Sequence, residues 1–187
     1  MKYLLILFTT ICISVQGFSQ SGTTRGARAL YNEVTELKNG QLQIVKSTYQ
    51  EFDKKGRVTL EVVFGVDSLM KSKETFAYDR KGNETIHTIY NSANQIESKI
   101  LTAYNRFNEK KSIAVYSVTD SLLEKTTFTY DNFGRKSLEL SVDSNNKQIK
   151  KITYSYDQRG TLNKRVIYDG ADNITQIKQY NYTYSTK

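Results

Sequence analysis

The stretch Tyr130-Asp131-Asn132-Phe133-Gly134-Arg135 decides the fold of this chain, because its pattern recurs every 26 residues. An aromatic residue followed by Asp or Asn stands at five positions in register, and Gly or Asn stands four positions beyond each aromatic. These pairs are Phe52-Asp53, Tyr78-Asp79, Tyr104-Asn105, Tyr130-Asp131 and Tyr156-Asp157. A further step of 26 from Tyr156 reaches Tyr182. Units in register without an insertion indicate a repeat protein.

Each unit contains the signature of a tight turn. Asp at the first position of a type I turn accepts hydrogen bonds from the N–H groups ahead of it, and Gly at the fourth position supplies a positive φ. This combination closes a hairpin with a one-residue bulge. Asn108 replaces Gly in the third unit, and Asn also tolerates the left-handed conformation. We therefore expect Asn108→Gly to be neutral or stabilising.

Polar segments midway between the tight turns predict a second set of turns, at residues 65–68, 91–94, 118–121, 143–146 and 169–172. Half a repeat then holds one strand of about eight residues and one turn. Alternation puts Phe128 and Tyr130 on one face of the strand that enters a tight turn. In the strand that leaves the tight turn, the residues at even-numbered positions include Leu138 and Leu140. We expect these side chains to share one buried face, with Thr and Ser on the other.

The predicted fold is all-β, an antiparallel meander of about 11 to 13 strands built from 26-residue hairpin repeats. Residues 32–37 and 41–47 predict a divergent hairpin around Lys38-Asn39-Gly40, and residues 180–184 predict a last strand. A flat sheet would leave its apolar face wet and its edges open. We therefore expect the sheet to curl into a barrel-like or shell-like form, with a two-layer sandwich as the alternative.

The N-terminus has the pattern of a secretory signal peptide. Lys2 precedes an apolar run at residues 3–15, and the small residues Gly17 and Ser19 stand before Gln20. The run is shorter than the roughly 20 residues of a membrane span. We predict a signal peptide at residues 1–19, a flexible segment at 20–27 and a single repeat domain at 28–187, with regular repeats at 48–184. The protein would then be exported to the periplasm, the cell surface or the medium, without a membrane span.

Charge and cysteine content limit the choice of partners. The formal net charge is +8, and removal of Lys2 with the signal peptide leaves +7 (8 − 1). The basic residues are scattered, so we predict no nucleic-acid binding and a surface that favours acidic polymers. The single cysteine, Cys12, lies within the signal peptide, so we expect neither a disulfide nor a lipid anchor.

The pattern Tyr-Asp-x-x-Gly-Arg at residues 130–135 resembles the YD repeats of RHS-type proteins, and the resemblance covers residues 48–184. It implies a curled β-sheet in an exported or cell-surface protein, and some members of the family are credited with carbohydrate binding. Large members enclose a cargo domain within a shell of such repeats. This chain has far fewer repeats and no protease-like or toxin segment, so the enclosing role does not carry over.

No catalytic, metal or cofactor site is predicted. The repeated Asp residues have the position of turn caps, and His87 is the only histidine, without an adjacent motif for catalysis. Aromatic rings can stack on sugars, so the candidate ligand-stacking residues are Tyr154, Tyr180, Tyr182 and Tyr184.

Two functions follow from this reading. The first is an exported, non-catalytic binding module for extracellular or envelope carbohydrate. The alternative is a structural or assembly protein that pairs with a partner protein through its sheet surface or edges. The partner is thus a polysaccharide or another protein, and no enzyme activity is expected.

Overall fold

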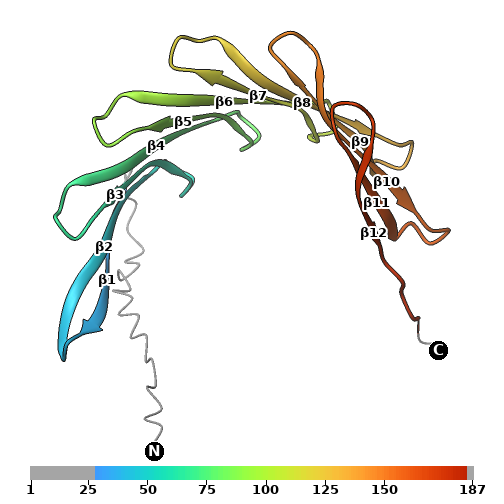
Figure 1. The fold of residues 1–187 in the computed structure, drawn as a ribbon. Helices are drawn as coiled ribbons and strands as arrows, with labels where there is room; N and C mark the ends of the chain where they lie inside the picture. Colours follow the sequence, from blue (N-terminus) through green and yellow to red (C-terminus); the bar gives the residue numbers. More distant parts are fainter. Residues whose placement is uncertain (1–27, 185–187) are drawn as a thin grey trace, which may run out of the picture. The chain divides into compact units, whose positions relative to one another are not determined.

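The structure, a computed structural model, describes residues 28–184, and these form β-strands joined by short turns (Figure 1). These residues include no helix, and so none that is long and apolar enough to cross a membrane. The strands are β1 (Arg28–Lys38), β2 (Gln41–Phe52), β3 (Val58–Phe64), β4 (Met70–Tyr78), β5 (Glu84–Tyr90), β6 (Ile96–Tyr104), β7 (Lys110–Ser117), β8 (Leu122–Tyr130), β9 (Lys136–Asp143), β10 (Gln148–Tyr156), β11 (Leu162–Tyr168) and β12 (Ile174–Gln179).

The twelve strands follow one another in the sheet in the order of the sequence, and neighbours run antiparallel. This confirms the predicted all-β antiparallel meander. The order has two ends, β1 and β12, so the described residues form an open sheet and not a closed barrel.

The chain divides into two units. The first unit comprises the chain up to Phe76 together with the later segment Ile89–Ile96. The second unit comprises Ala77–Thr88 together with the chain from Glu97 onward. Within the second unit, the direction of the strands turns steadily from β6 to β12 (Figure 1). Such turning is expected, because the intrinsic twist of β-strands rotates each strand relative to its neighbours.

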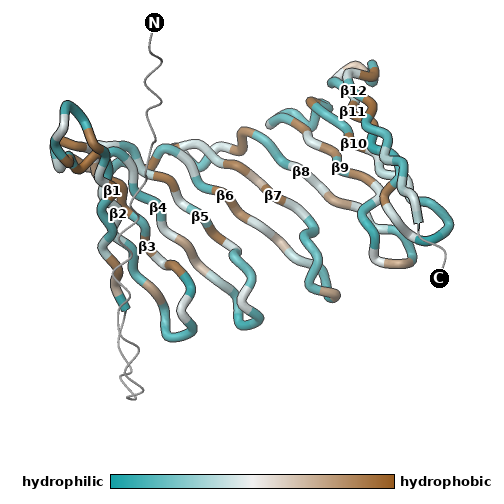
Figure 2. Tube along the Cα trace, turned by 90° about the horizontal axis from the view of Figure 1, so that it is seen from below, coloured by the Kyte–Doolittle hydropathy of each residue, from teal (hydrophilic) through white to brown (hydrophobic). Residues whose placement is uncertain are grey.

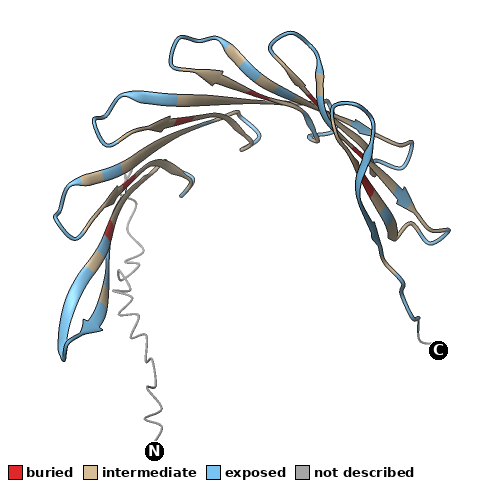
Figure 3. Ribbon diagram, in the orientation of Figure 1, coloured by how far each residue is buried: buried red, intermediate tan, exposed pale blue. Residues whose placement is uncertain are grey.

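The sheet has little core. The buried hydrophobic residues are Val62, Ala114, Ile152 and Val166, and most other strand residues are half-buried (Figure 3). Hydrophobic and hydrophilic positions are interspersed along the strands (Figure 2). The prediction of one well-buried face is therefore wrong for the described residues. Side chains in this single layer are covered mainly by the neighbouring strands on either side.

The predicted sharing of faces is also wrong. Thr127 lies opposite Leu140, whereas Phe128 lies opposite Glu139. The aromatic residues of the entering strand therefore share a face with charged residues, and the aliphatic residues share the other face with Thr. The cause is the bulge beside each tight turn, as between Thr129 and Tyr130. One extra residue shifts the pairing and reverses the parity of the next strand.

The turns themselves agree with the sequence. Gly56, Gly82, Asn108, Gly134 and Gly160 all have positive φ, and Asn108 has φ 70°. We call residues 53–56, 79–82, 105–108, 131–134 and 157–160 the tight-turn row. The opposite set, the second-turn row, comprises residues 65–68, 91–94, 117–120, 143–146 and 169–172. Its third member begins at Ser117, one residue earlier than predicted.

The two ends of the chain differ in how well they match the prediction. The N-terminal hairpin is confirmed, with Asn39 and Gly40 both at positive φ between β1 and β2. The predicted last strand at 180–184 is wrong, because β12 ends at Gln179. Among the described residues up to Tyr184, no strand follows β12. The predicted signal peptide at 1–19 and the segment 20–27 lie outside the described residues.

Candidate functional site

The tight turns are capped by their Asp side chains. The Asp131 carboxylate accepts hydrogen bonds from the backbone N–H groups of Phe133 and Arg135, both at 2.9 Å, and pairs with the Arg135 guanidinium. The Arg135 side chain holds the pKa of Asp131 below its ordinary value. Hydrogen bonds from Arg57 lower the pKa of Asp53 to about 2. The Asp series thus has the turn-capping role expected from the sequence.

The repeated tyrosine links one repeat to the next. The hydroxyls of Tyr104, Tyr130 and Tyr156 each donate to a backbone carbonyl 20 residues earlier, at 3.0, 2.9 and 2.7 Å. The accepting carbonyls belong to Glu84, Lys110 and Lys136. Each accepting residue is the first of the strand that leaves the preceding tight turn. A tyrosine at this position therefore fixes the spacing of adjacent tight turns.

The third repeat departs from this pattern in its turn. Asn105 replaces Asp, and its amide donates to Glu109 at 2.7 Å where the fourth repeat has an Asp–Arg pair. Asn108 replaces Gly, and its side-chain amide forms two reciprocal hydrogen bonds with that of Asn83, at 2.6 and 3.1 Å. These bonds tie the second tight turn to the third. Replacement of Asn108 by Gly would remove them, which changes the expectation drawn from the sequence.

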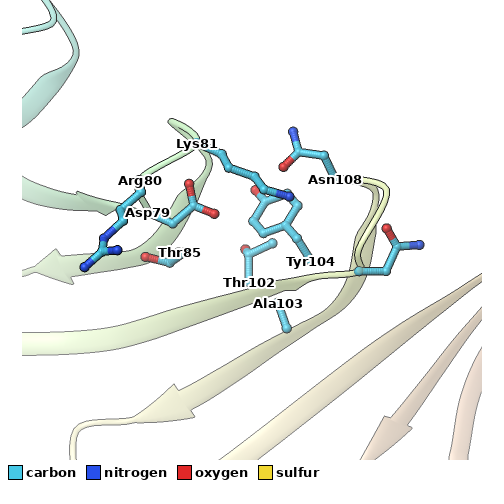
Figure 4. Close-up of a pocket in the computed structure, with 9 residues that line it drawn as sticks. Asp79, Arg80, Lys81, Thr85, Thr102, Ala103, Tyr104 and Asn108 are labelled. Atoms are coloured by element: carbon cyan, nitrogen blue, oxygen red, sulfur yellow. The ribbon is translucent and has the colours of Figure 1, made fainter.

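A cavity of about 450 Å³ lies beside this departure, entirely within the second unit. The turn at 79–82 and the turn at 105–108 form two of its sides, and β5 and β6 contribute the rest (Figure 4). The Tyr104 ring is its aromatic wall, and Lys81 extends over it from the turn (Figure 4). Its lining residues are Asp79, Arg80, Lys81, Thr85, Thr102, Ala103, Tyr104, Asn105 and Asn108.

Thr102, which lines the cavity, is smaller than the residue at the same position of the other repeats. The residue two positions before the tight-turn tyrosine is Phe76, Phe128 or Tyr154 in three other repeats, and it is Thr102 in the third. An aromatic ring on this face of β6 would occupy volume that a threonine leaves open. The gap in the aromatic column, together with Asn105 and Asn108, is the sequence signal for this site. Of the lining residues, Asp79, Tyr104, Asn105 and Asn108 were identified from the sequence only as parts of the turns, and none was predicted to bind a ligand.

The chemistry of the cavity suits recognition better than catalysis. Asp79 accepts two hydrogen bonds of 2.9 Å from Asn83, one from its backbone N–H and one from its side chain. Asn83 thereby lowers the pKa of Asp79, which keeps this carboxylate ionised. A general acid at neutral pH needs a raised pKa instead. The remaining polar lining includes the cationic side chain of Lys81 and the residues Thr85 and Thr102, while the Arg80 side chain points away from the Tyr104 ring (Figure 4).

Tyr154, the first of the candidate tyrosines, lies half-buried in β10 on the aromatic and charged face. Its hydroxyl donates to Glu139 at 2.6 Å, and the Lys136 ammonium lies 5.6 Å from its ring centroid. Burial, followed by the bond to Glu139, raises the pKa of Tyr154. Its hydroxyl and one side of its ring therefore already have partners within the protein.

Tyr180, Tyr182 and Tyr184 follow β12. The Tyr180 backbone N–H donates to the Asn163 carbonyl at 2.9 Å. Tyr182 and Tyr184 are 47% and 42% exposed, with ring centroids 6.3 Å apart. The Tyr184 hydroxyl donates to Asp157 at 2.9 Å, and the Arg159 guanidinium lies 4.0 Å from its ring. The structure thus brings Tyr182 and Tyr184 together, and Tyr184 is held against the last tight turn.

The remaining titratable residues give no second site. His87 lies half-buried in β5 and does not line the cavity. Among residues 28–184, no group of three or more His, Cys, Asp or Glu side chains is placed to hold a metal ion.

Comparison with known proteins gives no family assignment. No protein-family model matches the chain, and no curated protein matches its sequence. Similar solved structures include a Tc holotoxin pore from Photorhabdus luminescens, with 13% identity and a TM-score of 0.32. A TcdB2–TccC3 complex without its hypervariable C-terminal region has 14% identity and a TM-score of 0.34. Each match covers 80% of this chain and 11% of the toxin chain.

A porin-like protein from Bacteroides uniformis has 11% identity and a TM-score of 0.33, over 81% of this chain and 89% of that chain. In contrast, this chain spans only 11% of the length of each toxin chain that it matches. At these TM-scores, no property of these proteins transfers to this chain.

Proposed function

We propose that this chain is an exported, non-catalytic module that binds carbohydrate in the cavity beside Tyr104. The observation that carries the proposal is the cavity beside the break in the repeat at Thr102, which has an aromatic wall and a few polar groups. Sugar sites commonly combine a ring for stacking with a few hydrogen-bonding groups that fix orientation. The export and the module's place among the YD-repeat proteins rest on the sequence alone.

The charge of the cavity favours an acidic glycan. The Lys81 ammonium extends over the Tyr104 ring (Figure 4), whereas the single carboxylate, that of Asp79, is engaged within its own turn. The whole chain is also basic, with a net charge of +8. A uronic acid or another sugar carboxylate would meet Lys81 over the Tyr104 ring. Binding should therefore weaken as salt screens this attraction.

The experiment is a glycan array followed by titration of one acidic hit at several salt concentrations. Lys81→Ala should weaken binding several-fold and flatten the dependence on salt. Lys55 occupies the same turn position in the first repeat, so Lys55→Ala is the matched control and should leave binding unchanged. Incubation with the hit should release no reducing ends.

Two outcomes would contradict the proposal. Equal loss of binding in both lysine variants would show that charge acts without the cavity. The absence of any polysaccharide hit, alongside one tight protein partner in pull-downs, would favour the structural function instead. The specific observation in favour of that second function is the exposure of the two end strands, β1 and β12.

A further inference from the structure

The described sheet ends in two strands that have a neighbour on one side only. Ten of the eleven residues of β1 are exposed, and all six residues of β12 are exposed. A free strand edge presents unpaired backbone N–H and C=O groups, which can pair with another strand. Such edges are often protected by proline, and this chain contains none.

Burial in this sheet depends on neighbours at both sides. Val166 in β11 is only 7% exposed, because β10 and β12 flank it. Ile177 in β12 lies directly opposite Val166 and is 52% exposed. Val34 in β1 is likewise 44% exposed. The apolar side chains of the end strands thus lack the cover that one more strand would supply.

The two free edges are complementary in strand type. An even-numbered strand leads into a tight turn and pairs with the odd-numbered strand that follows the turn. Examples are β2 with β3, β8 with β9 and β10 with β11. β12 is the next even-numbered strand, and β1 is an odd-numbered strand whose other side is free. A β1 placed antiparallel beside β12 would continue the alternation already present within the chain.

From this complementarity we propose that the partner of the free edges is a second copy of this chain, with β12 of one copy paired to β1 of the next. Lys178 is the charged residue of β12, and the charges of β1, on Arg28, Glu33, Glu36 and Lys38, sum to zero, so no net repulsion opposes the pairing. The contact joins two different surfaces, and each joined pair keeps one free β1 and one free β12. Association of this kind is head-to-tail, so successive copies form a ring where the rotation between them closes and an open chain where it does not.

This inference does not depend on the carbohydrate proposal. If both hold, each added copy brings one further cavity into the same assembly. A repeating polymer could then be bound at several points, with a gain through effective concentration.

Sedimentation of the purified chain over a wide concentration range tests the inference. The wild-type chain should shift from monomer to oligomers as concentration rises. Val34→Asp and Ile177→Asp each place a charge at one edge, and each variant alone should stay monomeric. Mixed together, they should form a one-to-one dimer, because one retains its β12 edge and the other its β1 edge.

Val118→Asp is the matched control, since Val118 is 65% exposed in the second-turn row and lies at neither free edge. It should associate as the wild type does. Circular dichroism and melting must show that all three variants fold. A monomeric wild type at every concentration would overturn the inference. A dimer that survives in Ile177→Asp alone would do the same, because it would show β1 pairing with β1.

Discussion

The two rows of turns have the same backbone and different chemistry. In the tight-turn row the left-handed position is Gly in four of five turns, whereas in the second-turn row it is Ser68, Asn94, Asp120, Asn146 and Asp172. Tyrosine hydroxyls link successive tight turns to rigid backbone carbonyls. In the second-turn row, long lysines reach the next turn, as Lys73 reaches Asn94 at 3.0 Å and Lys151 reaches Asp172.

The difference shows where the repeat keeps its spacing and where it can change. A phenol bound to a carbonyl has few rotatable bonds and is neutral, whereas an exposed lysine pair is flexible and screened by salt. The tight-turn row therefore holds the repeats together. A cavity lies where the repeat departs from its pattern, at Asn105 and Asn108 in this row and at Thr102 in β6, while Tyr104 still keeps the spacing.

The largest effect is expected from valine at a left-handed position. Gly134→Val should destabilise the protein by about 1–2 kcal/mol or more, because a β-branched residue is poorly tolerated at φ +74°. Asn146→Val, in the second-turn row, should cost less, since Asn already carries part of the left-handed strain. Urea unfolding measures both. Equal losses of unfolding free energy in the two variants would mean that the two rows tolerate valine at the left-handed position equally well.

Loss of one inter-repeat bond should have the next largest effect. Tyr156→Phe removes the 2.7 Å bond to the Lys136 carbonyl and should cost about 0.5–1.5 kcal/mol. Tyr168→Phe, at the end of β11 just before a turn of the second-turn row, is the control, because the Lys151 ammonium lies 4.6 Å from the centroid of a ring that the change leaves intact. Thermal unfolding of the two variants should rank Tyr156→Phe as the less stable. The reverse order would reject the tyrosine link as the main spacer.

Acid should weaken the tight-turn row. The folded pKa of Asp53, about 2, is below its ordinary value, so its contribution is present above the unfolded pKa and is lost as pH falls toward 2. Asp79, Asp131 and Asp157 also have lowered pKa values, owing chiefly to hydrogen bonds from Asn83, Arg135 and Thr161. In Asp53→Asn, the free energy of unfolding should therefore fall less on acidification than it does in the wild type. An unchanged fall would show that Arg57 does not stabilise the Asp53 carboxylate in the fold.

The smallest effects separate two asparagines at the same backbone position. Asn146→Gly should be neutral or stabilising by up to about 1 kcal/mol, because it relieves a left-handed residue. Asn108→Gly gains the same relief but loses the reciprocal amide bonds to Asn83. It should therefore be the less favourable of the two in urea unfolding. A larger gain at Asn108 would show that the amide pair adds no stability.

The sequence predicted the features that depend on local turn chemistry. The repeat register, the left-handed Asn108 and the N-terminal hairpin all follow from Gly, Asn and Asp at fixed spacing, and the structure confirms them. The facial assignment failed because a bulge adds a residue that strict alternation does not count. Phe128 consequently lies opposite Glu139, on the face away from Leu140.

The site was harder to predict than the fold. The four candidate tyrosines were chosen as parts of the regular aromatic column or the chain end, and at least Tyr154 and Tyr184 have hydroxyls bound within the protein. The cavity arises where the column is interrupted. The sequence signal for the cavity was Thr102, a small residue at a position where the other repeats have larger ones. A search for residues that recur in every repeat does not select such an exception.

Restoring the repeat at Thr102 tests the central claim most directly. Thr102→Phe places in the third repeat the residue that Phe128 provides in the fourth, so the chain should fold normally with the cavity filled. Thr129→Phe makes the same change at an exposed position of β8, outside the cavity. In calorimetric titration with an acidic glycan, the wild type and Thr129→Phe should bind alike and Thr102→Phe should not bind. Unaltered binding by a folded Thr102→Phe variant would contradict the account.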